Sequence, residues 1–209
     1  LKLSRGLGDV YKRQIRGIAG EELTPQFACR LGKSIVSHLN ARCIAVARDI
    51  RESGPDLHDS FIEGVIVSGC DVMDLGITTT GVLYRASLDL DVDVSVMITA
   101  SHNPPEYNGF KICKGTLPMA GEELQELRET MEIGDFMEGT GKLIDAQEFQ
   151  RQYIERVIEN VGKPGRKIRV AIDCGNAVPG PLAIRVLESI GVDVVLSLIH
   201  ISEPTRQLQ

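Results

Sequence analysis

The chain has 209 residues, of which 43% are hydrophobic and 25% are charged. This balance is typical of a soluble globular protein with one domain, or with one domain and part of another. The net charge of −6 argues against a nucleic-acid partner. Because no apolar run approaches the roughly 20 residues of a membrane helix, we also expect no membrane partner.

The cysteines and the N-terminus bear on the cellular compartment. Five cysteines are spread along the chain without a Cys-x-x-Cys pair. An odd number without that spacing fits a reducing compartment better than a disulfide framework. The N-terminus shows no apolar segment of a signal peptide. We therefore expect a cytoplasmic location.

The two ends of the chain are predicted to be foreign to the fold. Residues 4–14 read SRGLGDVYKRQ and residues 196–206 read LSLIHISEPTR. One stretch of DNA, read in opposite orientations, can encode both segments: CAG for Gln14 gives CTG for Leu196, and TCT for Ser4 gives AGA for Arg206. We interpret residues 1–14 and 196–209 as translated sequencing-adapter sequence and its surroundings, and we exclude them from the fold prediction.

From residue 15 onward, helical and strand patterns alternate. Thr24 and Pro25 read as an N-cap followed by proline at the first helical position, and apolar residues then recur at helical spacing up to Leu39. Ser53 and Pro55 are predicted to open a second helix. Further helices are expected at residues 79–86 and 121–133, and strands at residues 43–47, 71–76, 93–98 and 109–113. Strands that are apolar without alternation, placed between helices, predict an α/β sheet covered by helices on both faces.

A polar, glycine-rich stretch at residues 133–142 indicates a domain boundary. A new helical stripe then runs from Phe149 to Val161. It is followed by a predicted strand at 168–173, a turn at 174–180, a helix at 181–190 and the start of a strand at 193–195. Residues 15–142 are therefore predicted to form a first domain. Residues 143–195 are predicted to form the incomplete start of a second, similar α/β domain.

The stretch VSVMITASHNPPEYNGFK, residues 94–111, places an apolar strand directly before Ser101. Ligand sites in open α/β sheets lie at the carboxyl ends of strands, so Ser101 is a candidate nucleophile or phosphate carrier. Serine, asparagine and proline are also ordinary turn formers, and a single histidine such as His102 is more often structural than catalytic. Lys111 and Arg16 would both supply positive charge to a phosphate, although spacing alone does not show that they converge.

The segment TASHNPPEYNGFK, residues 99–111, resembles the active-site serine loop of the α-D-phosphohexomutases. Within that superfamily, YNGFK is most similar to the phosphomannomutase/phosphoglucomutase branch. The segments IRG (15–17) and ARDIRESGP (47–55) resemble two further family motifs, and VAIDCGNAVPG (170–180) resembles the opening of the second domain. The resemblance covers nearly all of residues 15–195 and implies that the sheet of the first domain is mixed.

The resemblance also implies the chemistry of a phosphohexomutase, which is an isomerase and an intramolecular phosphotransferase of carbohydrate metabolism. Ser101 would be carried as a phosphoserine that exchanges its phosphoryl group with a hexose 1-phosphate or 6-phosphate, through a hexose 1,6-bisphosphate. Mg²⁺ would be bound partly by the serine phosphate, because phosphoryl transfer depends on positioning and charge neutralisation. Arg16 and Lys111 match positions that contact phosphate or reacting oxygens, and His102 matches a position with a proton-transfer role.

Two departures from the family pattern matter. Arg13 and Gln14 stand where the family has an aromatic residue and an aspartate, which fits replacement by the adapter-like segment. The chain also contains no Asp-Gly-Asp-x-Asp-Arg loop, so the other metal ligands implied by the resemblance are missing. We therefore expect an N-terminal fragment that is inactive by itself, whose partner in the intact enzyme is a small sugar phosphate.

Three alternatives stay open on the sequence. Phosphoglucosamine mutase belongs to the same superfamily, although PPEYNGFK (104–111) argues against it. A serine hydrolase would require a Gly-x-Ser-x-Gly elbow, and both glycines are missing around Ser101. A non-catalytic phosphate-binding module would differ from a mutase in carrying no phosphate on Ser101. The preferred sugar is not indicated.

Overall fold

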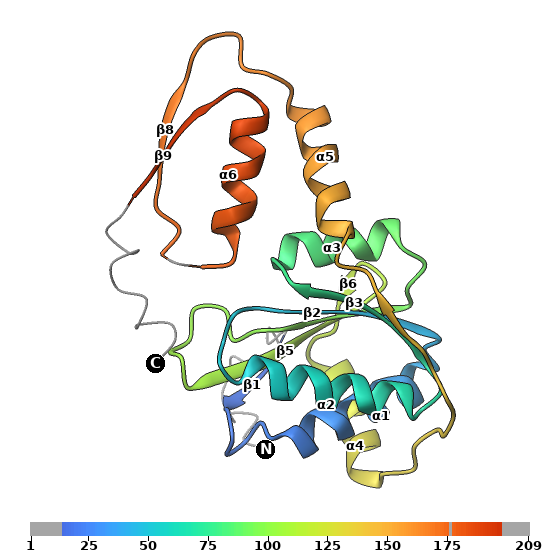
Figure 1. Ribbon diagram of the computed structural model, residues 1–209. Helices are drawn as coiled ribbons and strands as arrows, with labels where there is room; N and C mark the ends of the chain where they lie inside the picture. Colours follow the sequence, from blue (N-terminus) through green and yellow to red (C-terminus); the bar gives the residue numbers. More distant parts are fainter. Residues whose placement is uncertain (1–13, 176, 198–209) are drawn as a thin grey trace.

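The computed structural model describes residues 14–175 and 177–197, and it contains a main sheet with helices on both faces and a smaller unit with two strands (Figure 1). In chain order the elements are β1 (Ile15–Ile18), α1 (Pro25–Leu39), β2 (Cys43–Arg48), α2 (Gly54–Ile66), β3 (Asp71–Ile77), α3 (Thr80–Asp89), β4 (Val94–Ile98), β5 (Tyr107–Lys114), β6 (Leu117–Pro118), α4 (Glu122–Ile133), β7 (Leu143–Asp145), α5 (Phe149–Val161), β8 (Arg169–Ile172), α6 (Pro179–Ser189) and β9 (Asp193–Leu196).

The main sheet is mixed and has the strand order β1-β5-β4-β2-β3-β7, with β6 beside β5. The strands β4, β2, β3 and β7 run parallel to one another, whereas β5 runs antiparallel to both β1 and β4. The predicted α/β fold with a mixed sheet is therefore confirmed. Because β4 and β5 are hydrogen-bonded neighbours, the loop between them is a direct connection that starts at the carboxyl end of a central strand.

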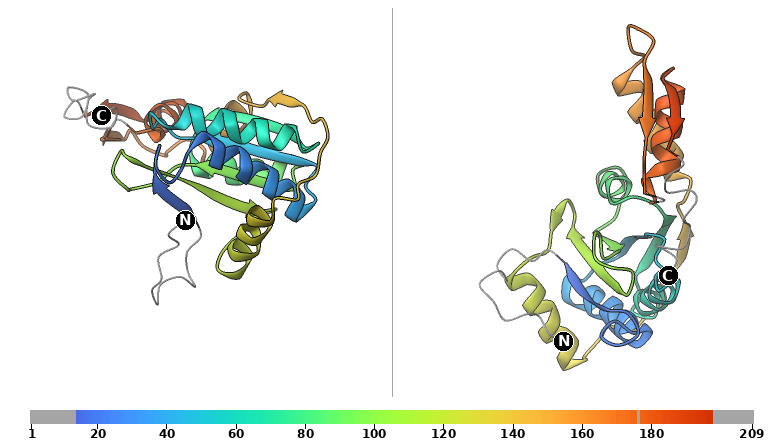
Figure 2. Two further views of the ribbon diagram at one scale, coloured as in Figure 1. Left: turned by 90° about the horizontal axis from the view of Figure 1, so that it is seen from below. Right: turned by 90° about the vertical axis from the view of Figure 1, so that its left-hand side faces the viewer.

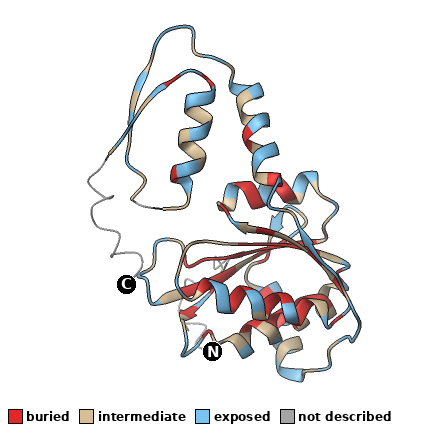
Figure 3. Ribbon diagram, viewed as in Figure 1, coloured by how far each residue is buried: buried red, intermediate tan, exposed pale blue. Residues whose placement is uncertain are grey.

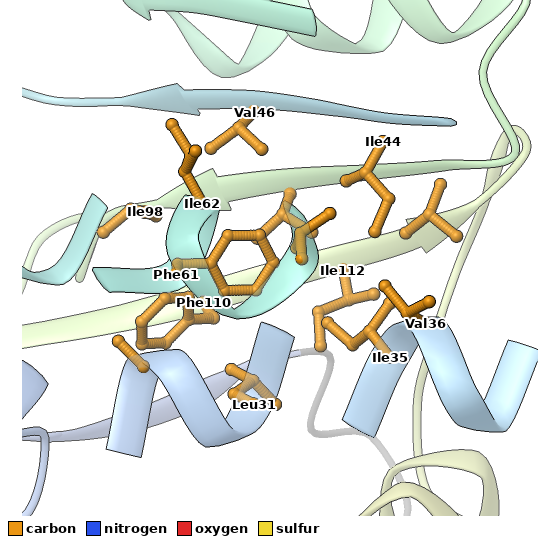
Figure 4. Packing of buried hydrophobic residues seen from close by; sticks show 14 of the residues in the cluster. Leu31, Ile35, Val36, Ile44, Val46, Phe61, Ile62, Ile98, Phe110 and Ile112 are labelled. Carbon is orange, nitrogen blue, oxygen red and sulfur yellow. The ribbon is translucent and has the colours of Figure 1, made fainter. Parts of the chain in front are cut away.

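Helices cover both faces of this sheet (Figures 1 and 2). The larger core lies between the sheet and the pair α1 and α2, with α4 packed against α1. At its centre the ring of Phe61 from α2 lies 5.8 Å from the ring of Phe110 in β5, surrounded by aliphatic side chains of both layers (Figure 4). A smaller core on the opposite face joins Met97 of β4 to Val82 and Leu83 of α3.

The helices α1 and α2 approach each other very closely at two glycines. A Cβ atom added at Gly64 would lie 2.0 Å from the carbonyl oxygen of Cys29, and one added at Gly32 would lie 2.5 Å from that of Phe61. Neither backbone can move aside without separating the helices, so these positions require glycine for packing.

Local signals explain where some of the helices begin and end. The Thr24 hydroxyl accepts a hydrogen bond from the Phe27 N–H at 3.1 Å and caps α1 as predicted. The helix α2 also begins at the predicted place, but the Ser53 hydroxyl accepts a hydrogen bond from the Asn108 side chain at 2.9 Å and makes no cap bond. The helix α3 continues to Asp89, past the predicted end at residue 86, and β5 starts at Tyr107 because this residue still pairs with β1.

The second unit contains the parallel pair β8 and β9, covered by α6, with α5 leading into it (Figures 1 and 2). Its strands contain no buried residue (Figure 3). The apolar side chains of Val170, Ile172, Ile184 and Leu187 are half-buried. The main sheet also extends past residue 142, because β7 pairs with β3 from Leu143 onward. The main sheet therefore includes Leu143–Asp145, which the sequence prediction assigned to the second unit.

Most of the predicted adapter sequence, residues 1–13 and 198–209, lies outside the described residues. Within the described ends, Gln14 donates a hydrogen bond to the Thr99 carbonyl, and Leu196 pairs with Ile172 at the end of β9. Among the residues described, no helix has the length and apolar character that a membrane span requires.

Candidate active site

Ser101 lies three residues after the end of β4, in the loop from Thr99 to Glu106 that we call the serine loop. Its φ angle of 59° is in the left-handed region, where a residue with a Cβ atom is strained. The Ser101 N–H donates a hydrogen bond to Thr99 Oγ1 at 2.9 Å, and Ser101 Oγ shares a hydrogen bond of 3.0 Å with His102 Nδ1. Such backbone strain persists only where the surrounding structure enforces it.

The guanidinium group of Arg51 holds this loop through its backbone carbonyl oxygens. Arg51 lies just after β2, and its side chain is only 12% exposed. Its terminal nitrogens donate hydrogen bonds to four backbone carbonyl oxygens, those of Ser101 (3.0 Å), Asn103 (2.8 Å), Pro104 (2.7 Å) and Tyr107 (2.9 Å). Arg51 therefore holds the loop from Ser101 to Pro104 and ties it to the first residue of β5.

The carboxylate of Asp49 links Arg51 to the serine. Asp49 accepts hydrogen bonds from the Arg51 backbone N–H at 3.0 Å and from Arg51 Nε at 3.2 Å. It also accepts one from Thr99 Oγ1 at 2.6 Å, and the same hydroxyl binds the Ser101 N–H. A continuous path of hydrogen bonds thus runs from Asp49 through Thr99 to Ser101.

Asp49 and Arg51 are functional candidates that the sequence reasoning missed. The segment ARDIRESGP (47–55) resembles a family motif, but the resemblance by itself assigns neither residue a role. A signal was present: Asp49 follows β2 and Thr99 follows β4, and the two strands pair in parallel with Arg48 opposite Ile98. Polar residues that follow neighbouring parallel strands meet at the same sheet edge.

The two predicted cations lie on one face of the sheet. Arg16 of β1 stands opposite Gly109 of β5, and Lys111 stands two residues further along β5, opposite Met97. Arg16 donates hydrogen bonds to Asn103 Oδ1 at 3.0 Å and to Gln14 Oε1 at 2.8 Å, which joins β1 to the serine loop.

Lys111 has an unusual environment for a lysine. Burial lowers the pKa of its ammonium group, the positive charge of Arg16 lowers it further, and Asp49 opposes the shift. Within residues 14–175 and 177–197, its side chain forms no hydrogen bond and no ion pair. Lys111 is therefore a half-buried cation whose donors are not committed to the described part of the chain.

A cleft of about 570 Å³ opens at the serine loop. Ser101 and His102 line one side, Thr79 and Thr80 at the start of α3 line another, and Val178 and Pro179 contribute from the second unit. Arg16 and Lys111 are not among the lining residues. The structure therefore places Ser101 and His102 together in the cleft, Arg16 against the loop through Asn103, and Lys111 beside Arg16 on the same sheet face.

The described residues do not form a magnesium site by themselves. Across residues 14–175 and 177–197, no group of three or more His, Cys, Asp or Glu side chains is placed to hold a metal ion. The carboxylate of Asp49 lines the cleft but is engaged by Thr99 and Arg51.

Several known proteins with similar sequences carry the names of mutases. The family model of the phosphoglucomutase/phosphomannomutase alpha/beta/alpha domain I matches residues 9–138. A phosphomannomutase/phosphoglucomutase of Pseudomonas aeruginosa is 39% identical over 184 residues, which are 87% of this chain and 39% of that protein. A probable phosphoglucosamine mutase of Methanopyrus kandleri is 34% identical over 186 residues, which are 87% of this chain and 41% of that protein.

A solved structure agrees with these matches. The phosphoglucomutase/phosphomannomutase family protein of Burkholderia thailandensis superposes with a TM-score of 0.83 at 33% sequence identity, over 90% of this chain and 43% of that one. The chain thus spans about two fifths of the length of these relatives. Because the domain model covers more than half of it, the chain belongs to the phosphoglucomutase/phosphomannomutase family of enzymes.

Proposed function

We propose that this chain supplies the phosphoserine unit of a phosphohexomutase that interconverts hexose 1-phosphate and hexose 6-phosphate. The observation that carries the proposal is the placement of Ser101. Ser101 lines a cleft and lies on a strained loop. Arg16 of β1 donates a hydrogen bond to Asn103 of the same loop. The lysine of the same sheet face, Lys111, has no partner among the described side chains.

The proposed step is the transfer of a phosphoryl group between Ser101 Oγ and a sugar hydroxyl. As the new bond between phosphorus and the sugar oxygen forms, the sugar hydroxyl releases its proton to solvent, and the bond between phosphorus and Oγ breaks. His102 is placed to give a proton to the leaving Oγ, since its Nδ1 lies 3.0 Å from Oγ. In the reverse step the same ring nitrogen accepts that proton. Arg16 and Lys111 supply the positive charge that a transferring phosphoryl group requires.

The sugar specificity is proposed at the level of the branch. The relatives include mutases named for mannose, glucose and glucosamine phosphates. The Pseudomonas protein is more similar to this chain than the Methanopyrus protein, which favours a phosphomannomutase/phosphoglucomutase. We keep phosphoglucosamine mutase as the second candidate because of the 34% identity to a protein of that name.

Other features of the proposal rest on the family alone. A protein of the relatives' full length is proposed to use Mg²⁺, to employ hexose 1,6-bisphosphate as intermediate and activator, and to work in the cytoplasm. Ser101, carried as a phosphoserine, would give the metal one oxygen ligand through its phosphate. Magnesium prefers octahedral oxygen coordination, so the other ligands must come from outside the described residues.

The test is a chimera in which residues 15–195 replace the matching segment of the Pseudomonas protein. Conversion of glucose 1-phosphate or mannose 1-phosphate is followed in a coupled assay with Mg²⁺ and activating bisphosphate, and mass spectrometry locates the phosphate. We expect turnover and a phosphate on Ser101. The 209-residue chain assayed alone is expected to be inactive, because it spans 39% of the Pseudomonas protein. Near-normal turnover of the Ser101→Ala chimera would refute the phosphoserine mechanism, and a phosphate-free Ser101 in an inactive chimera would favour a binding module.

A further inference from the structure

The guanidinium group of Arg51 has no donor left for a ligand. Arginine carries five N–H donors in a rigid plane. Arg51 Nε donates to Asp49, and each of the two terminal nitrogens donates to two carbonyl oxygens, three of them in the serine loop and the fourth that of Tyr107 in β5. Arg51 lines the cleft beside Ser101, but its side chain is only 12% exposed, and all five donors are used by groups of the protein.

These bonds act on the part of the backbone that is strained. The first carbonyl that Arg51 binds belongs to Ser101, the residue with the left-handed φ angle. The last belongs to Tyr107, where β5 begins and the sheet fixes the backbone. Because one planar group binds Ser101, the middle of the loop and the first residue of β5, the loop cannot relax at Ser101 without breaking several hydrogen bonds together.

We propose that Arg51, oriented by Asp49, is a positioning residue that fixes Ser101 Oγ in the cleft and is not itself a phosphate ligand. The phosphate part of this inference rests on the proposed function; the clamp on the loop does not. Phosphorylation would add nearly two negative charges at Oγ. Lys111, whose donors are uncommitted among the described residues, and Arg16 receive that charge, while Arg51 keeps its carbonyl partners.

The experiment uses the 209-residue chain in two forms, with serine or with phosphoserine inserted at position 101 during synthesis. Amide hydrogen exchange is measured in both forms for wild type, Arg51→Lys and Asp49→Asn. The matched control is Arg30→Lys, because Arg30 also donates two hydrogen bonds to a backbone carbonyl, that of Met131, far from the serine loop. A lysine cannot bridge four carbonyl groups, so we expect exchange in the serine loop to accelerate about tenfold or more in Arg51→Lys.

In Arg30→Lys the serine loop is expected to exchange at the wild-type rate. Asp49→Asn removes a charged acceptor but keeps the hydrogen bonds from Arg51 to the carbonyl oxygens. Amide exchange in the serine loop should therefore accelerate less in Asp49→Asn than in Arg51→Lys. Wild-type exchange rates in the loop of a folded Arg51→Lys chain would overturn the clamp. The side-chain Nε–H signal of Arg51 in ¹⁵N NMR tests the second part without any variant: it should stay in place on phosphorylation, and a large shift would show that Arg51 binds the phosphate.

Phosphorus NMR of the phosphoserine form separates this inference from the proposed function. The second pKa of the wild-type phosphate should lie below the ordinary value for phosphoserine, and Lys111→Met should raise it. Arg51→Lys should also raise this second pKa although the charge is kept, because the loop no longer holds the phosphate near Lys111. Arg30→Lys should leave it unchanged. A phosphate that titrates normally in wild type would refute the cation site of the proposed function and leave the clamp standing. An unchanged titration in Arg51→Lys would refute positioning.

Discussion

The ring nitrogen Nε2 of His58 lies 3.0 Å from Oδ1 of Asp74, which joins α2 to β3 inside the protein. The imidazole is 7% exposed, and its other nitrogen lies 2.9 Å from the Asp59 carboxylate. Asp74 Oδ1 also accepts a hydrogen bond from the Gly76 N–H at 2.8 Å, at a point where β3 bends with a φ angle of 64°. The bend leads to Thr79, which lines the cleft.

This pair predicts a pH-dependent stability. Burial alone would lower the pKa of His58, but hydrogen bonds to Asp74 and Asp59 outweigh it and raise the pKa above the ordinary 6.5. Burial alone would raise the pKa of Asp74, but the bonds from His58 and Gly76 lower it below 3.8. A raised histidine pKa stabilises the fold fully below 6.5, and this contribution is lost as pH rises through the folded-state pKa. The aspartate contribution is present above 3.8 and is lost as pH falls through its lowered pKa.

The contribution of the His58–Asp74 pair to the free energy of unfolding should therefore be largest between pH 3.8 and pH 6.5. Urea denaturation at several pH values between about 5 and about 9 measures it. Asp74→Asn should reduce stability by about 1.5–3 kcal/mol at the acidic end, the usual range for a hydrogen bond to a charged group, and should flatten the pH dependence. Asp91→Asn, at an exposed aspartate, is the control. An unchanged slope in Asp74→Asn would contradict the assignment.

A second prediction concerns the contact of α1 with α2. Gly64→Ala places a methyl group 2.0 Å from the Cys29 carbonyl oxygen, so the helices must separate. We expect a loss of about 3 kcal/mol or more in the free energy of unfolding, at the upper end for overpacking. Gly165→Ala is the matched control, because a Cβ atom there meets nothing within 4 Å. Equal stability of the two variants would show that the helices are not packed as described.

The left-handed backbone at Ser101 predicts that glycine is more stable than alanine at this position. Ser101→Gly and Ser101→Ala both remove the hydroxyl, but only glycine is free of strain at a φ of 59°. The glycine variant should therefore unfold with a free energy about 1 kcal/mol higher than the alanine variant. Thermal or urea denaturation compares them directly. If alanine is as stable as glycine, the loop does not hold Ser101 in the left-handed region.

The ammonium group of Lys111, which binds no side chain among the described residues, predicts a loss of activity in the chimera when it is removed. Lys111→Met should lower kcat by about 100-fold or more, because removing one preorganised donor at a developing charge has effects of this size. Lys114→Met is the matched control, since Lys114 is the exposed last residue of the same strand. A Lys111→Met chimera with the control's kcat would exclude Lys111 from the reaction.

Much of the fold could be predicted because its signals are local. The cap at Thr24, the apolar strand from Cys43 and the loop after Ile98 are all visible in short stretches of sequence. The clamp by Arg51 could not be predicted in the same way. Its acceptors are backbone carbonyls about 50 positions away, and every residue has a carbonyl, so no pattern of residue types marks them.

Long-range pairing limited the prediction elsewhere too. The prediction placed the end of the first domain at residue 142, on a polar, glycine-rich composition. The structure continues the sheet with β7, whose exposed residues Leu143–Asp145 have no strong apolar pattern and are fixed by pairing with β3. Likewise, the hydroxyl of Ser53 is a favourable cap by type, but it is bound by the distant Asn108. In these cases a tertiary contact outweighs the local preference.

The antiparallel pairing of β1 with β5 has a consequence for the order of folding. It joins Ile15 to Phe110, and three helices and three strands lie between them in the sequence. The hairpin of β4 and β5, in contrast, closes a short loop, and contacts between distant residues form more slowly than local ones. We therefore expect the serine loop to take shape before Arg16 reaches it, so that a newly made chain brings Arg16 to Asn103 only when its first strand docks.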